Sequence, residues 1–85
     1  MAGEAAGLHG KVALITGAGQ GIGQGVALAM SAAGAAVVVT GRTLSKVEET
    51  ARLVRERGGK ALALACDVKS AQDLTQVLDR TIAEF

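Results

Sequence analysis

The sequence predicts an α/β fold: a three-layer, doubly wound parallel sheet with helices on both faces. Three apolar segments have the length of strands, at residues 11–16, 35–40 and 61–66. A longer segment of good helix formers follows each of them, which is typical of parallel strands joined by right-handed crossover helices. A glycine-dense turn also follows the first apolar segment, as in many βαβ units. The predicted order is therefore β-α-β-α-β-α, with the strands in the sheet order 3-2-1.

The composition is that of a folded chain without a strongly charged surface. The chain has 85 residues, of which 49% are hydrophobic, and it has no proline, so disorder is not expected for most of it. A net charge of +1 without a basic cluster argues against nucleic acid or a membrane surface as a partner. Cys66 is the single cysteine, so no internal disulfide and no Cys/His metal site is predicted, and a cytoplasmic location fits.

The chain divides into a lead-in and one domain. Residues 1–10 are rich in Ala and Gly without periodicity, and we expect a mobile segment there. Residues 11–85 form the domain. Its last helix reaches Phe85 with no cap, glycine or polar tail after it, so we expect the chain to be the N-terminal segment of a longer protein.

The first two strands flank a helix of small residues. The strand at 11–16 is apolar throughout, and we expect it to be buried on both faces. The helix is expected at residues 21–33, where Gly34 stops it. The second strand, 35–40, is rich in β-branched side chains.

The second helix has one apolar face. Ser45 and Glu48 predict a capping box at its start, and Gly58 and Gly59 end it. The residues expected on its buried face keep helical spacing and are Leu44, Val47, Ala51 and Val54.

The third strand, 61–66, leads to a helix that opens at Ser70 with Asp73 three residues later. Helical spacing again predicts a buried stripe, which consists of Leu74, Val77, Leu78, Ile82 and Phe85.

The turn after the first strand reads TGAGQGIG over residues 16–23. Glycines allow a backbone to turn through positive φ and to approach a pyrophosphate closely, and the helix that follows points free N–H groups at the anion. The spacing is Gly17-x-x-x-Gly21-x-Gly23 rather than the generic G-x-G-x-x-G. Two alternatives are a flexible linker and a membrane packing face that includes Gly25. Ordered apolar elements on both sides oppose the first, and the short apolar stretch opposes the second.

This turn, TGxxxGIG, resembles that of the short-chain dehydrogenase/reductase family, and the resemblance extends over about residues 8–85. It implies the N-terminal half of a Rossmann fold that binds a nicotinamide dinucleotide. The complete enzyme would transfer a hydride between the nicotinamide and a carbonyl or alcohol carbon of a small substrate, and would be a homo-oligomer. The turn residues implied to bind the cofactor are Gly17, Gly19, Gln20, Gly21 and Gly23.

The end of the second strand indicates which cofactor form is bound. An acidic residue there would accept hydrogen bonds from the adenosine ribose, but the position holds Gly41, followed by Arg42 and Thr43. Arg42 can pair with a 2′-phosphate and Thr43 can add a hydroxyl, which resembles members that prefer NADP(H) to NAD(H). Several of those relatives also have a basic residue where Gln20 stands, so the preference depends on Arg42. The alternative is that Arg42 is a solvated turn residue.

Three further contacts are implied by the resemblance. Asp67 would pair with the exocyclic amine of adenine, and the backbone beside it, at Val68, would help to hold the ring. Ile22 would lie under the nicotinamide. The alternative for Asp67 is that it only caps the turn that follows, as Asp does in many proteins.

No catalytic residue is assigned. The family uses a Tyr and a Lys in a YxxxK pair with a Ser upstream, together with an Asn-Asn-Ala-Gly motif, and this chain has no Tyr and no Asn. The 85 residues alone are therefore expected not to transfer hydride. The other hypothesis is a finished, non-catalytic nucleotide-binding or interaction module.

Overall fold

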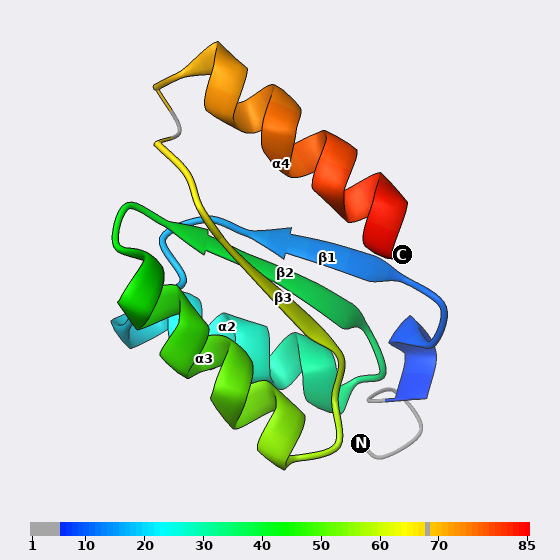
Figure 1. Cartoon of the computed structure of the whole chain (residues 1–85). Coiled ribbons are helices and arrows are strands. Elements are labelled where there is room, and N and C mark those ends of the chain that lie inside the picture. The colour runs from blue at the N-terminus through cyan, green and yellow to red at the C-terminus, as the bar shows by residue number, and fades with distance from the viewer. Residues whose placement is uncertain (1–5, 68) are drawn as a thin grey trace.

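The computed structural model describes residues 6–67 and 69–85, and its elements follow the predicted order (Figure 1). A short 3-10 helix, η1, precedes three strands that alternate with three α-helices. The bounds are η1 (Ala6–Leu8), β1 (Val12–Ile15), α2 (Gly21–Ala32), β2 (Ala36–Gly41), α3 (Leu44–Glu56), β3 (Ala61–Ala65) and α4 (Ala71–Glu84).

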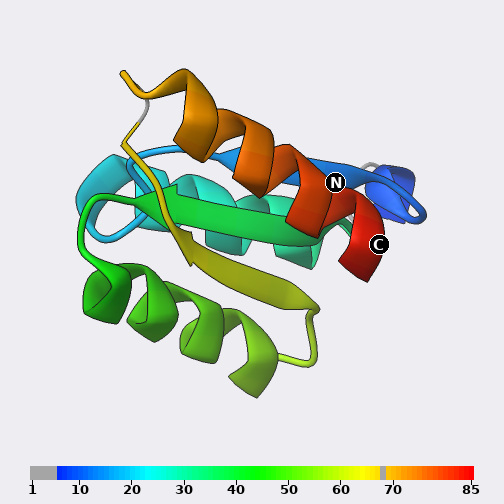
Figure 2. The same ribbon diagram turned by 45° about the horizontal axis from the view of Figure 1, so that its top comes forward.

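The three strands form one parallel sheet in the order β1-β2-β3. Val39 of β2 is in register with Ile15 of β1 and with Ala63 of β3. Helices α2 and α3 cover one face of the sheet and α4 lies on the other, so the molecule has three layers (Figure 2). The predicted doubly wound α/β half is confirmed.

The core is built from small and β-branched residues that alternate between the two faces of β2. Val37 and Val39 are fully buried against α2 and α3, whereas Val38 is fully buried on the face of α4. On the first face they pack against Ala27 of α2 and against Val47, Ala51 and Val54 of α3. These short side chains let both helices approach the sheet closely.

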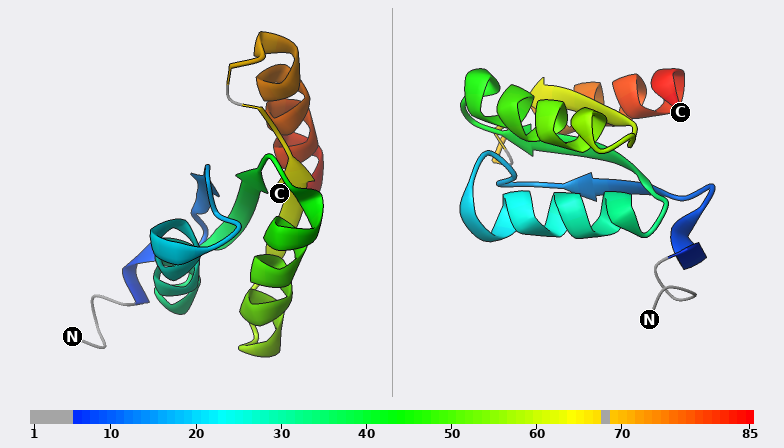
Figure 3. Two further views of the ribbon diagram at one scale, coloured as in Figure 1. Left: turned by 90° about the vertical axis from the view of Figure 1, so that its left-hand side faces the viewer. Right: turned by 90° about the horizontal axis from the view of Figure 1, so that it is seen from below.

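Strand β1 is not buried on both faces, contrary to the expectation. Ala13 and Ile15 pack toward α2, but Val12 and Leu14 on the opposite face are 44% and 42% exposed. The reason is the position of α4, which lies over the β3 side of the sheet rather than over β1 (Figure 3, left). No helix in the described part of the chain covers that face of β1.

The predicted buried stripe of α4 is wrong for three of its five residues. Val77 is buried and Leu74 is half-buried, and both pack with the side chains of β3 around Val38. Further along the helix, the apolar side chains remain exposed, although the end of α4 lies near the start of β3, where Phe85 borders a cavity with Lys60 and Ala61. The exposed residues are Leu78, Ile82 and Phe85.

The predicted starts of α3 and α4 have opposite outcomes. Ser70 caps α4, since its Oγ accepts a hydrogen bond of 3.2 Å from the Asp73 N–H. The capping box at Ser45 is wrong because α3 begins at Leu44 and its N-cap is Thr43, in extended conformation and with no side-chain cap bond. Leu44, which we expected to be buried, is 44% exposed at this first position of the helix.

Replacing Ser70 with alanine is expected to lower the free energy of unfolding by about 1 kcal/mol, because one amide of the first turn of α4 loses its partner. Ser45→Ala is the matched control, since Ser45 lies in the first turn of α3 but does not cap it. Its effect should stay within about 0.5 kcal/mol. Urea denaturation of both variants checks this, and equal losses would contradict the assignment of the caps.

The segment before β1 is partly regular. Residues 6–8 of the expected lead-in form η1, and the Leu8 N–H donates to the Ala33 carbonyl at the end of α2. The Lys11 N–H then donates to the Leu8 carbonyl, so the chain turns directly into β1.

Candidate functional site

The turn after β1 and the turn after β2 lie side by side at the carboxyl ends of the strands (Figure 3, right). This is the edge at which open α/β sheets bind ligands. A pocket of about 210 Å³ lies between the two turns. It is smaller than a typical site for a whole drug-sized ligand, so it suits one end of a dinucleotide. Its lining consists of Gly17, Gly19, Gln20, Gly41, Arg42, Thr43, Lys46 and Val47.

Three glycines of the first turn are required by its geometry. Gly17 and Gly21 have φ +63° and +62°, in the left-handed region that other residues rarely adopt. Gly23 touches Gly17 from the first turn of α2: a Cβ added at Gly23 would lie 2.2 Å from the Gly17 carbonyl oxygen. Helix α2 therefore packs directly on the backbone of the turn.

The start of α2 is open to an anion. The N-cap residue, Gln20, makes no side-chain cap bond, and the first turn of the helix has no acidic residue. The amides at this end are therefore not neutralised by the helix's own side chains, and the positive end of the helix dipole lies beside the pocket. Ile22, also in this first turn, is 88% exposed.

The middle of the turn is held from both sides at Ala18, which is fully buried. The Ala18 N–H donates to the Thr40 carbonyl of β2 at 2.9 Å. The Ala18 carbonyl accepts a bond of 2.6 Å from the Thr50 hydroxyl of α3. A third bond lies at the end of β1, where the Thr40 hydroxyl donates to the Ile15 carbonyl at 3.3 Å. The conformation of the turn thus depends on neighbouring elements as well as on its glycines.

Arg42 and Thr43 follow β2 and line the pocket with the turn. Both are exposed, and the Thr43 hydroxyl is not used to cap α3. Across residues 6–67 and 69–85, no hydrogen bond or ion pair occupies the Arg42 guanidinium. These groups could therefore bind a phosphate without first breaking an internal contact.

Lys46 is a pocket residue that the sequence analysis missed. Its Cβ lies only 2.9 Å from where a Cβ on Gly19 would be, so its stem packs on the turn. Lys46 also lies in the first turn of α3, where a cation is unfavourable next to the helix dipole. The sequence signal that could have identified Lys46 is a lysine in the first turn of a helix, one helical turn after Arg42.

Asp67 lies at the same edge of the sheet, but it does not line the pocket. The strand end is fixed beside β2, since the Cys66 N–H donates to the Gly41 carbonyl at 2.8 Å. The Asp67 N–H donates to Asp73 Oδ2, and Asp67 Oδ1 accepts from the Lys69 N–H, both at 3.0 Å. One carboxylate oxygen of Asp67 therefore serves the turn that follows, as the alternative interpretation expects. Val68 lies outside the described residues.

Burial raises the pKa of the Cys66 thiol, and the carboxylates of Asp73 and Asp67 add to the effect. The thiol is 3% exposed and uncharged at neutral pH, in keeping with its packing against Val38 and Val77. It is a core residue and not a nucleophile.

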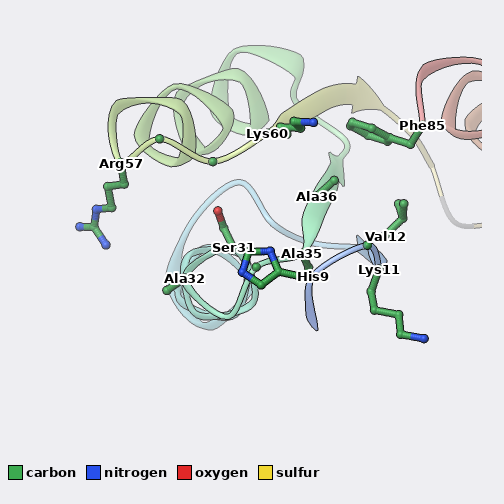
Figure 4. A pocket seen from close by; sticks show the side chains of 14 residues that line it. His9, Lys11, Val12, Ser31, Ala32, Ala35, Ala36, Arg57, Lys60 and Phe85 are labelled. Atoms are coloured by element: carbon green, nitrogen blue, oxygen red, sulfur yellow. The ribbon is translucent and has the colours of Figure 1, made fainter. Parts of the chain in front are cut away.

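A larger cavity, of about 520 Å³, lies at the opposite edge, where the strands begin (Figure 4). Four basic residues border it, but Lys11 and Arg57 extend in divergent directions (Figure 4). Several backbone amides around it already donate to nearby carbonyls, for example Gly59 to Val54 and Gly34 to Ser31. The cations around this cavity therefore do not converge on an anion, and part of its backbone is already hydrogen-bonded.

Two other kinds of site are absent from the described ranges. Among residues 6–67 and 69–85 there is no group of three or more His, Cys, Asp or Glu side chains placed to hold a metal ion. Within the same ranges no helix combines the length and the apolar character needed to cross a membrane.

Comparison with known proteins identifies the family. Residues 11–85 match the family described as short chain dehydrogenase. The chain belongs to the short-chain dehydrogenase family. The predicted resemblance is confirmed, and the glycine turn of this dehydrogenase segment lies where the family pattern led us to expect it.

Individual relatives are about three times as long as this dehydrogenase segment. The 7α-hydroxysteroid dehydrogenase of Escherichia coli strain K12 is 39% identical over 78 residues, which cover 92% of this chain and 31% of that protein. Among solved structures, a short-chain dehydrogenase/reductase of Mycobacterium marinum is 44% identical with a TM-score of 0.86, and the match covers 91% of this chain and 30% of that one. A 7α-hydroxysteroid dehydrogenase in complex with NADH and 7-oxoglycochenodeoxycholic acid is 39% identical with a TM-score of 0.87, over 89% of this chain and 30% of that one.

Proposed function

We propose that this segment binds NADP(H) for a short-chain dehydrogenase, with the pocket between the two turns as the site of the 2′-phosphate. The observation that carries the proposal is the lining of that pocket. Arg42, Thr43 and Lys46 lie against the glycine turn there, and no carboxylate lines the pocket with them. Two cations and a hydroxyl suit a phosphate dianion and not a neutral ribose edge.

The remaining cofactor contacts follow from the arrangement of the turn. The glycine turn and the open N-terminus of α2 would bind the pyrophosphate. Asp67 would accept from the adenine amine through Oδ2, because Oδ1 is already bonded to the Lys69 N–H. The backbone at Val68 would border the ring, and the exposed Ile22 would supply an apolar contact beneath the nicotinamide.

The activity of the whole protein is part of the proposal. We propose an oxidoreductase that transfers a hydride between the nicotinamide and a carbonyl or alcohol carbon, assembled as a homo-oligomer in the cytoplasm. Relatives named as hydroxysteroid dehydrogenases support this reaction class. The 85 residues supply cofactor binding only, since the Tyr that acts as proton donor in the family has no equivalent in this chain.

The form of the nicotinamide cofactor can be tested directly. A solved relative was crystallised with NADH, so the choice between the two forms must depend on this chain's own residues. NADPH is expected to bind roughly 10- to 100-fold more tightly than NADH, because hydrogen bonds to a charged group contribute about 1.5–3 kcal/mol. An NMR titration of the ¹⁵N-labelled chain with each cofactor measures weak as well as tight binding.

Salt gives an internal control for that titration. The preference for NADPH should decrease as the salt concentration rises, because Arg42 and Lys46 are exposed and their attraction to a phosphate is screened. Equal affinities at low salt, or tighter binding of NADH, would contradict the NADP(H) assignment.

A further inference from the structure

We infer that Thr50 is a positioning residue for the cofactor, because its hydroxyl holds the Ala18–Gly19 peptide so that the Gly19 N–H points toward the phosphate pocket. Thr50 lies in the middle of α3 and has no exposed surface. It is a polar residue on a face of α3 that is otherwise apolar. The inference rests on the proposed function, since it assigns a role in the binding of the same cofactor.

The Thr50 hydroxyl has one proton to donate, and two backbone carbonyls are within reach of it. The Ala18 carbonyl is 2.6 Å from Oγ1, whereas the Lys46 carbonyl one turn back in α3 is 3.5 Å away. The shorter bond is within the normal range and the longer is at the limit of a hydrogen bond. The proton therefore goes to Ala18, in another element, and not to the helix's own backbone.

A contact from α2 sets the orientation of this hydroxyl. Gln24 of α2 donates from Nε2 to Thr50 Oγ1 at 3.1 Å. Since Gln24 donates to a lone pair of this oxygen, the hydroxyl proton points away from Gln24, and the nearest acceptor is the Ala18 carbonyl. The chain from Gln24 through Thr50 to Ala18 thus connects α2 and α3 to the turn between β1 and α2.

The geometry of a trans peptide sets the direction of the Gly19 N–H. The C=O and N–H of one peptide group point in opposite directions, and the described chain has no cis peptide bond. With the Ala18 carbonyl directed to Thr50, the Gly19 N–H points away from it. The Gly19 nitrogen lies 3.9 Å from where a Cβ on Gly41 would be, and both glycines line the pocket. Thr50 therefore directs an amide toward the anion although it does not touch the pocket itself.

Thr50→Val tests the role, because it removes the hydroxyl and keeps the shape of the side chain. The Kd for NADPH should rise about tenfold, the effect of one buried hydrogen bond that loses its partner. In ¹⁵N NMR spectra, the Gly19 amide peak of the unmutated chain should shift on addition of NADPH, and that shift should be reduced in Thr50→Val. A side chain with a purely structural role would not alter the response of this one amide in a folded variant.

Two controls separate the hydroxyl from general stability. Thr81→Val removes a similar bond, of 2.7 Å to the Val77 carbonyl in α4, and should leave the Kd unchanged. Thr50→Ala and Thr50→Ser lose the same methyl group and differ only in the hydroxyl. The alanine variant should bind about tenfold more weakly than the serine variant. This pair gives the answer if Thr50→Val does not fold.

The outcomes distinguish the two proposals. Equal NADPH affinity in the alanine and serine variants, with an unchanged response of the Gly19 peak, overturns the role of Thr50 and leaves cofactor binding intact. Absence of NADPH binding by the unmutated chain overturns the proposed function, and the inference about Thr50 with it.

Discussion

Replacing Gly23 with alanine is expected to lower the free energy of unfolding by about 3 kcal/mol. A Cβ there would lie 2.2 Å from the Gly17 carbonyl oxygen, 2.9 Å from its carbon and 3.0 Å from the Ala18 Cα. All three are backbone atoms, which cannot rotate away as a flexible side chain could. Helix α2 must therefore shift relative to the turn, which disrupts the contact between the two.

The same change should weaken NADPH binding about 100-fold. The displaced helix no longer presents its N-terminal amides beside Gly17, and interactions of this kind with a charged group contribute up to about 3 kcal/mol. Urea denaturation measures the loss of stability, and NMR titration at a temperature where the variant is folded measures the loss of affinity.

Gly25→Ala is the matched control, two residues further along α2. Nothing lies within 4 Å of a Cβ added there, and the residue is exposed. Alanine should therefore raise the stability by up to about 1 kcal/mol through its helix propensity. Opposite signs at positions 23 and 25 are the expected result. A loss of the same size at both would mean that the helix, and not its contact with the turn, is sensitive.

Arg42→Ala is expected to raise the Kd for NADPH roughly 10- to 100-fold and to leave the Kd for NADH within about twofold. The guanidinium has no other partner in the described chain, so its removal breaks no internal contact and the effect should be confined to the phosphate. Arg42→Lys should recover part of the affinity, because it keeps the charge but cannot bind two phosphate oxygens in parallel.

Lys46→Ala should change the Kd in the same direction and by less than Arg42→Ala, since the ammonium is a single point charge on a flexible stem. Arg57→Ala is the control, because Arg57 is exposed at the opposite edge of the sheet and should not affect either cofactor. If Arg42→Ala weakens NADPH and NADH equally, then Arg42 does not contact the 2′-phosphate.

The parts of the fold that the sequence predicted are those that depend on local pattern. The continuous apolar segments form the three strands, the spaced glycines form the turn, and Ser70 caps α4 by accepting from the Asp73 N–H. In each case, the residues that decide the structure are neighbours in the chain, so their spacing is enough.

The errors concern residues whose surroundings come from distant parts of the chain. The helical pattern of α4 identifies its apolar stripe, but it cannot tell that only Leu74 and Val77 pack into the buried core. The same limit applies to β1, whose apolar character does not show which face is covered. Ser45 shows a different limit, since a one-residue shift of the helix start turns a cap into an ordinary helical position.

The residues of the candidate site show the same difference between local pattern and distant packing. Arg42 could be assigned from its place after the second strand, but Lys46 needed the packing of α3 against Gly19. For Thr50 the sequence gives only a polar residue on an apolar helix face. Its partner, the Ala18 carbonyl, is 32 positions away in the chain, and no periodicity connects the two.

The burial of Cys66 has a practical use in these experiments. Because this thiol is buried and its pKa is raised, a maleimide probe at neutral pH should react slowly with it. A second cysteine introduced at the exposed Lys60, on the edge away from the glycine turn, would then be labelled selectively. The natural sequence thus permits attachment of a single fluorophore that reports on the molecule without obstructing the pocket, and no endogenous cysteine needs to be removed first.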